Sequence, residues 1–290
     1  MKFHTPAHFN FSLRRVFLLV PVLIVLTTAS AFSHTLYIQS SRYLASEGKS
    51  IPLFFCYGHF IPVADGIRGK KLNKVQIIAP NGQAQTVEIM DGKGLHSHMV
   101  EYNTPGIWGL TAETTPGYYT FYKDKNGKER HAIKSIAQIK NRLGQVIKSY
   151  YSKQYAKTYV KCDNPTGPFP ANLGLPLELV PVQNLFELKP GSTLKLDVYL
   201  DGKPYTGKGT WDATYMGFST QAEDNFYPNT QVEGTRVSIP LPNPGRWFIR
   251  YFIKKDAPEQ DKDKYLQMKL TASLTLQIDN ERKTPEPQSH

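Results

Sequence analysis

The chain has 290 residues, a formal net charge of +11 and an apolar fraction of 40%. This length has room for one large domain or two ordinary ones. An excess of basic residues is typical of nucleic-acid-binding proteins. Here lysines and arginines are interspersed with acidic residues, so the sequence predicts no nucleic-acid partner. A weakly basic surface that lies near anionic lipid headgroups fits this charge better.

The first 33 residues have the three parts of a secretory signal peptide. Two arginines precede an apolar run over 16–26, and a small-residue segment follows. Ala31 and Ser33 are the small residues that a signal peptidase requires, so we expect a periplasmic protein whose mature chain begins at His34. Cleavage after Ala31, or retention of the run as an anchor, are the alternatives. The run is shorter than the roughly 20 apolar residues that span a bilayer.

Short aromatic and β-branched segments, separated by Gly, Pro and Asn about every ten residues, predict an all-β fold of two immunoglobulin-like β-sandwich domains. The N-terminal sandwich is expected over 34–163. Its candidate strands are 35–39, 50–57, 74–78, 85–90, 94–102, 107–113 and 118–123. Between 132 and 160 the apolar spacing fits either a short helix or a twisted strand.

A segment rich in Pro and Gly at 164–176 predicts a linker. The C-terminal sandwich is expected over 177–278, with candidate strands at 177–181, 193–200, 209–215, 236–240, 245–254 and 265–278. Asp201 and Gly202 predict a tight hairpin turn, because both residues tolerate a positive φ. The polar tail 279–290 is expected to be frayed.

The two cysteines, Cys56 and Cys162, allow two interpretations. In an oxidising compartment such a pair is often a disulfide. Cys56 lies in a candidate strand, however, and a buried free cysteine behaves as a small apolar residue. A thiolate metal ligand is a third alternative.

Four histidines of the N-terminal sandwich are candidate metal ligands: His34, His59, His96 and His98. A chain that begins at His34 offers its α-amine and its ring to one ion. His59 follows Gly58 at the end of a strand, and His96 and His98 are two residues apart, so they share one strand face. Nitrogen ligands suit zinc, copper, cobalt and nickel alike, rather than magnesium or calcium.

Each candidate also has an ordinary structural interpretation, in which His59 is a loop histidine bonded to backbone and the H-x-H pair is an exposed polar face. No hydrolase, metalloprotease or phosphate-loop motif is present in the sequence, so no enzymatic activity is predicted. Two alternatives remain. One is a carbohydrate-binding or adhesion sandwich that uses Trp108, Trp211 and Trp247, and the other is a copper redox protein with an N-terminal histidine.

The sequence resembles the secreted two-domain proteins described as periplasmic components of cobalt or nickel uptake systems. The resemblance covers nearly the whole mature chain and rests on 34–37 (HTLY), 58–63 (GHFIPV), 116–119 (PGYY), 155–157 (YAK), 174–181 (GLPLELVP), 200–204 (LDGKP) and 244–249 (PGRWFI). It implies binding of nickel or cobalt through His34 and His59, with His96 and His98 as added donors, and transfer to membrane transporter components.

Overall fold

The computed structural model describes residues 34–165, 167–221 and 224–280, and it confirms the all-β class. The signal peptide expected over 1–33 and nearly all of the polar tail lie outside these residues. The described part contains one α-helix, α1 (Ile136–Ile139), and short 3-10 turns. No helix in this part of the chain has the length and apolar character needed to cross a bilayer.

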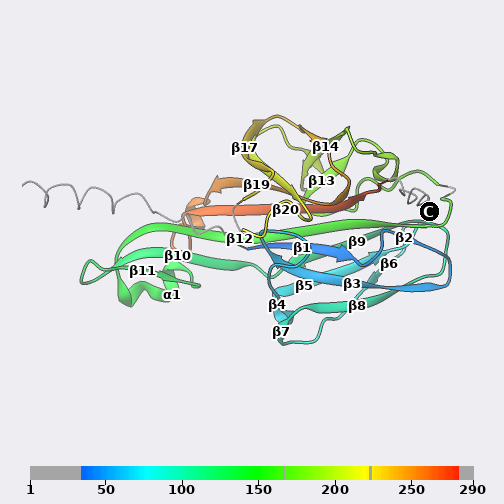
Figure 1. Ribbon diagram of the computed structural model, residues 1–290. Helices are drawn as coiled ribbons and strands as arrows, with labels where there is room; N and C mark the ends of the chain where they lie inside the picture. The colour runs from blue at the N-terminus through cyan, green and yellow to red at the C-terminus, as the bar shows by residue number, and fades with distance from the viewer. Residues whose placement is uncertain (1–33, 166, 222–223, 281–290) are drawn as a thin grey trace, which may run out of the picture. The chain divides into compact units, whose positions relative to one another are not determined.

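One large sheet runs through both halves of the chain (Figure 1). Its main path is β17-β16-β19-β20-β12-β9-β5-β6. These strands are β17 (Tyr227–Glu233), β16 (Lys208–Tyr215), β19 (Gly245–Asp256), β20 (Gln267–Ile278), β12 (Leu143–Cys162), β9 (Gly106–Thr114), β5 (Leu72–Ile78) and β6 (Ala84–Thr86). The 20-residue β12 joins the halves, because it pairs antiparallel with β9 and parallel with β20.

Two smaller sheets form the second layers. The first has the order β1-β3-β8, with β1 (Thr35–Ser40), β3 (Lys49–Gly58) and β8 (His96–Tyr102). The second contains β13 (Leu177–Pro181), β14 (Ser192–Leu200), β15 (Lys203–Pro204) and β18 (Arg236–Leu241). The short strands β4 (Ile67–Arg68) and β7 (Lys93–Gly94) pair with each other, and β2 (Leu44–Ala45) pairs with β12.

Two hydrophobic cores result from this layering, as expected for two sandwiches. Leu53 and Val100 of the first small sheet belong to one buried cluster with Leu110 of the large sheet. Leu196 and Ile249 belong to the other, which fills the C-terminal half. Alternating strand residues face these cores, which is why the strand pattern is readable in the sequence.

The stretch left open in the sequence, 132–160, contains both of the structures considered for it. Helix α1 is capped by Ser135, whose hydroxyl accepts a hydrogen bond from the Gln138 amide. The twisted strand β12 follows. It also pairs with β10 (Gly117–Asp124), which in turn pairs with β11 (Glu129–Ala132). The strand β17 was not predicted, since its polar sequence, YPNTQVE, is mostly exposed and lacks apolar alternation.

The outer edge of β1 faces the large sheet and is hydrogen-bonded by side chains. The Gln154 side-chain amide accepts from the Leu36 N–H at 2.6 Å and donates to the His34 carbonyl at 2.9 Å. Ser273 donates to the Leu36 carbonyl at 2.6 Å, and Thr275 donates to the carbonyl of Ile38. These polar side chains substitute for a neighbouring strand and so fix β1 against the sheet.

The segment 164–176 is fastened by a buried ion pair. Lys157 Nζ lies 2.7 Å from Glu178 Oε1, and both side chains are 1% exposed. Glu178 also accepts hydrogen bonds from the amides of Leu173 and Leu175, and Lys157 donates to the Ala171 carbonyl at 2.9 Å. The segment, which has no strand or helix among its described residues, is therefore held against β12.

Candidate metal site

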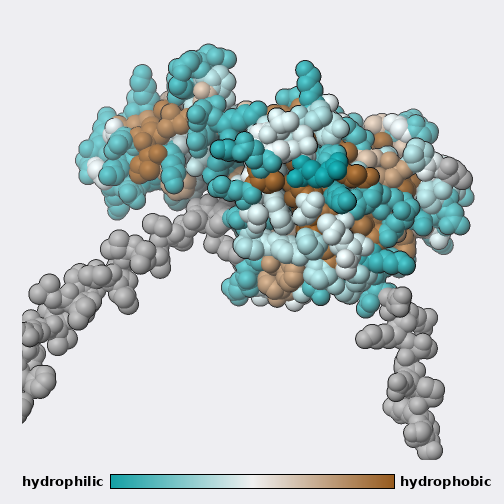
Figure 2. Space-filling model, turned by 90° about the horizontal axis from the view of Figure 1, so that it is seen from above, coloured by the Kyte–Doolittle hydropathy of each residue, from teal (hydrophilic) through white to brown (hydrophobic). Residues whose placement is uncertain are grey.

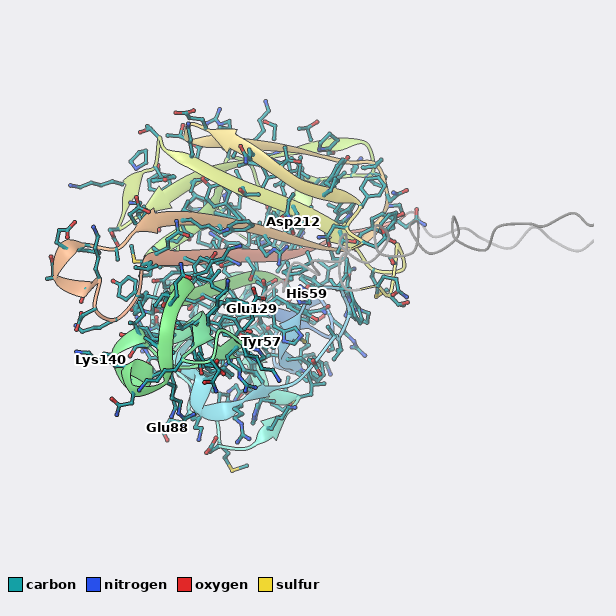
Figure 3. All side chains as sticks on the ribbon, turned by 90° about the vertical axis from the view of Figure 1, so that its left-hand side faces the viewer. Tyr57, His59, Glu88, Glu129, Lys140 and Asp212 are labelled. Atoms are coloured by element: carbon teal, nitrogen blue, oxygen red, sulfur yellow. The ribbon has the colours of Figure 1, made fainter. Side chains whose placement is uncertain are left out.

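The register of β1 and β3 brings two of the four candidate histidines together. Thr35 pairs with Gly58 in the antiparallel register. His34 precedes Thr35 and His59 follows Gly58, so the two histidines lie side by side at the end of the sheet. Their ring centroids are 4.9 Å apart and their planes are inclined by 44°. The Tyr57 ring lies 5.4 Å from the His34 ring. Figure 3 shows Tyr57 and His59 close together at this end of the molecule.

The loop that carries His59 is held against β1. The Tyr37 hydroxyl accepts a hydrogen bond from the Ala64 amide at 3.1 Å, and the Gln39 side chain donates to the Pro62 carbonyl. A Cβ at Gly58 would overlap the Cβ of Ala64. Glycine is therefore required where the loop folds back on the strand, and the position of His59 follows from that close approach.

Asp65 closes the same loop and was not singled out in the sequence. Its Oδ2 lies 3.5 Å from His34 Nε2, and its carbonyl accepts a hydrogen bond from the Tyr57 amide at 3.1 Å. A carboxylate six residues after His59 gives no local signal, because it reaches His34 only when the loop folds back. Its negative charge favours a cation beside these rings.

The two histidines differ in environment. The His34 side chain is 46% exposed, whereas His59 is 9% exposed. Burial lowers the pKa of His59 to about 4, with the positive charge of Arg250 and interactions with His34 and Lys269 adding to the effect, while Asp65 opposes it. At neutral pH the His59 ring is thus uncharged, which is the form that binds metals.

A buried arginine lies behind the pair. Arg250 on β19 binds Asp212 on β16 through two nitrogens, at 2.6 Å from Nη2 and 2.9 Å from Nε to Oδ2. Its remaining nitrogen, Nη1, lies 3.3 Å from the Thr35 hydroxyl. Because Thr35 follows His34, this contact anchors the start of β1.

The structure does not bring His96 and His98 to this pair. Both lie on β8, across β3 from β1, where they pair with Phe55 and Leu53. His96 Nε2 lies 3.0 Å from the Gly92 carbonyl oxygen. Among the described residues, no group of three or more His, Cys, Asp or Glu side chains is arranged to hold a metal ion. The four-histidine site therefore reduces to His34 and His59.

The cysteines are both free and buried, so the disulfide considered from the sequence is not formed. Cys56 belongs to a small cluster with Tyr37 and Phe248, whereas Cys162 belongs to the N-terminal core. Burial raises the pKa of the Cys56 thiol to about 12 and also raises that of Cys162. Both thiols are protonated at neutral pH, as in ordinary apolar packing.

Two of the three tryptophans are core residues. Trp108 is 6% exposed and Trp247 is fully buried, while Trp211 packs against the C-terminal core. Aromatic side chains that stack on sugars need exposed faces, which Trp108 and Trp247 do not offer. A surface depression of about 510 Å³, lined by Phe252 and Lys254 among others, includes none of the candidate histidines.

Comparison with known structures gives only distant similarity. A variant of Salmonella alpha-2-macroglobulin is 12% identical, with a TM-score of 0.24, over 84% of this chain and 15% of that one. A DUF4785 family protein from Legionella pneumophila is 8% identical, with a TM-score of 0.24, over 74% and 51%. The Parabacteroides merdae beta-glucuronidase is 11% identical, with a TM-score of 0.20, over 84% and 24%.

This chain thus spans only a small part of the macroglobulin that it matches. No curated protein matches the sequence. A family model does match, over residues 31–255, which is most of the chain and includes His34, His59, Asp65 and Arg250. The chain belongs to the family described as Domain of unknown function (DUF4198).

Proposed function

We propose that this protein binds a late transition metal ion, nickel or cobalt, in the periplasm and passes it to a membrane uptake system without catalysing a reaction. The observation that carries the proposal is the pairing of His34 and His59, whose ring centroids lie 4.9 Å apart beside Asp65. Two imidazoles next to a carboxylate form a donor set that suits these metals.

Processing supplies the third nitrogen. In a chain that continues through Ser33, the nitrogen of His34 is part of a peptide bond and is a poor metal ligand. In a chain that begins at His34, it is an amine. The donor set then consists of that amine and the two imidazoles, and the neutral form of His59 at pH 7 removes one competing proton.

Calorimetric titration with nickel, cobalt, copper and zinc tests this proposal. The chain that begins at His34 should bind, and His34→Ala and His59→Ala should each weaken binding by at least about tenfold, as expected when one ligand is lost. A chain that begins at Ser33 is the matched control for the amine, since it retains both rings. It should bind at least about tenfold more weakly.

His96→Ala with His98→Ala is the control for the rings that lie elsewhere, and this variant should bind normally. A wild-type titration that gives no more heat than the His34→Ala, His59→Ala double variant would refute the proposed site.

Tightest binding of copper, with turnover of an added reductant, would favour the redox alternative. Restoration of nickel or cobalt uptake in a deletion strain by wild type but not by His59→Ala tests delivery.

A further inference from the structure

Residues 117–153 form an arm at one end of the large sheet, beside the two sandwiches (Figure 1). The arm comprises β10, β11, α1 and the first half of β12, and its three strands have the order β11-β10-β12. On one face, Tyr122 and Ile139 are buried, and α1 covers this side. The opposite face has no such cover among the described residues.

The arm carries nearly all of the net charge of the mature chain. Within 117–153 there are nine lysines and arginines against two acidic residues, a net +7. The chain from His34 onward has a net +8, because Lys2, Arg14 and Arg15 account for the other three charges of the +11. The expectation that lysines and arginines are interspersed with acidic residues is therefore wrong for this segment. The rest of the chain from His34 onward is close to neutral.

Apolar groups lie among these charges. The rings of Tyr119 and Phe121 are 4.7 Å apart, and Tyr119 stacks at 5.8 Å on His131. Ile133, which directly follows β11, is 77% exposed, and Ile147, the unpaired residue of a bulge in β12, is 40% exposed. Figure 2 shows apolar side chains on the arm bordered by hydrophilic ones.

We propose that the uncovered face of the arm docks on an anionic phospholipid surface, with Ile133 and Ile147 entering the headgroup region. A basic segment near such a surface gains about 1 kcal/mol for each lysine or arginine, and tyrosine rings are enriched at the same depth. Exposed aliphatic side chains rimmed by cations are the pattern of an interfacial membrane contact.

The composition of the arm favours lipid over an acidic protein. Seven of its nine cations are lysines. Lysine is a hydrated point charge on a flexible stem and suits a diffuse, fluid layer of phosphates, whereas paired recognition of carboxylates favours arginine. Docking would place the protein beside membrane components. It uses none of the metal-site residues, so the docking proposal can be wrong while the metal-binding proposal holds, and the reverse.

Vesicle co-sedimentation tests the proposal, using the chain that begins at His34, which is a compact unit by itself and lacks the apolar run 16–26. Vesicles of phosphatidylethanolamine with phosphatidylglycerol should bind it, and phosphatidylcholine vesicles should not. Binding should weaken strongly in about 0.5 M salt, which shortens the screening length. The His59→Ala variant should bind vesicles like wild type.

Matched variants distinguish the effect of the positive charge on the arm from that of the net charge of the whole protein. Lys125→Gln, Lys134→Gln and Lys148→Gln together should weaken binding by on the order of 100-fold, at about fivefold for each lysine. The control set makes the same change at three exposed lysines of the C-terminal half, namely Lys189, Lys195 and Lys203, and should have little effect.

A second pair of variants tests insertion. Ile133→Ser with Ile147→Ser should weaken binding by about tenfold or more, because aliphatic burial in the headgroup region is lost. Met90→Ser with Val182→Ser, at exposed apolar residues outside the arm, is the matched control. Loss of binding in the lysine set alone would indicate adsorption by charge without insertion of the isoleucines and would overturn the proposal. So would equal losses in both lysine sets, or no binding to anionic vesicles.

Discussion

Two arginine–aspartate pairs in this protein have the same cross-strand geometry in different surroundings. Arg250 and Asp212 pair across β19 and β16 with 4% and 3% of their side chains exposed. Arg236 and Asp197 pair across β18 and β14 with 51% and 26% exposed. The first pair also holds Thr35, next to His34, so its integrity affects the candidate site as well as the fold.

Asp212→Asn should destabilise the protein by about 3 to 5 kcal/mol, because it leaves the Arg250 guanidinium charged and buried without its counter-ion. Asp197→Asn, the matched change at the surface, should leave the free energy of unfolding almost unchanged, because water solvates the released arginine. Urea denaturation of both variants measures the difference. Equal losses would show that burial is not what makes the first pair important.

At the scale of elements, β1 depends on side chains as substitutes for a neighbouring strand. Gln154 bonds the N–H of Leu36 and the carbonyl of His34 with one amide group. At the surface, Gln183 does the same for the N–H of Lys195 and the carbonyl of Thr193 on β14. The two glutamines therefore differ mainly in whether water can replace them.

Gln154→Met should lower the free energy of unfolding by about 1 to 3 kcal/mol, because the buried N–H of Leu36 and the partly buried carbonyl of His34 lose their partner. Gln183→Met should lower the free energy of unfolding much less, since the backbone groups that Gln183 bonds, on Lys195 and Thr193, are exposed to solvent. Loosening of β1 also moves His34, so Gln154→Met should weaken nickel or cobalt binding as well. Thermal unfolding and calorimetry report the two effects, and a normal metal affinity in Gln154→Met would argue against a site that depends on β1.

The buried Lys157 gives the stability of the protein a pH dependence. Burial lowers its pKa from 10.5 to about 8, against the opposing effect of Glu178. Between these values the unfolded chain holds a proton that the folded chain has lost, so this group raises the free energy of unfolding as the pH rises from about 8 to 10.5.

Comparison with Lys157→Met isolates this titration from that of the tyrosines. The stability of wild type minus that of the variant should increase from pH 8 to pH 10, by no more than about 1.4 kcal/mol for each pH unit. Urea denaturation at several pH values measures it. A difference that stays flat or decreases would mean that Lys157 keeps its proton in the folded chain.

At the scale of the whole described chain, β12 couples the two halves. Its middle section pairs with β20 and its last residues pair with β9, while β1 of the N-terminal half is bonded by Ser273 and Thr275 of β20. Pairing that is shared in this way predicts that the halves unfold together, although each has its own hydrophobic core.

The tryptophans allow this to be measured in each half. Trp108 lies in the N-terminal core, and Trp247 lies in the C-terminal core with Trp211 packed against it. The Trp108→Phe variant reports the C-terminal half by fluorescence, and Trp211→Phe with Trp247→Phe reports the N-terminal half. Within each variant, the fluorescence transition should coincide with the far-ultraviolet circular dichroism transition. Two separate transitions would show that the halves are independent folding units.

Local pattern in the sequence was sufficient to predict the all-β class and most strand positions. The expected strand 177–181 coincides with β13, and the turn predicted at Asp201 and Gly202 has the positive φ values that it requires. Strand alternation and turn chemistry act over a few residues, so a single sequence displays them.

Only the tertiary structure decided which distant residues meet. The register of β1 and β3 places His34 beside His59 and leaves His96 and His98 on another strand. The partnership of Arg250 with Asp212 depends likewise on which strands become neighbours. The period of a strand specifies the face on which a side chain lies, but the partner opposite is set by long-range pairing and by the packing of whole sheets, which no local pattern encodes.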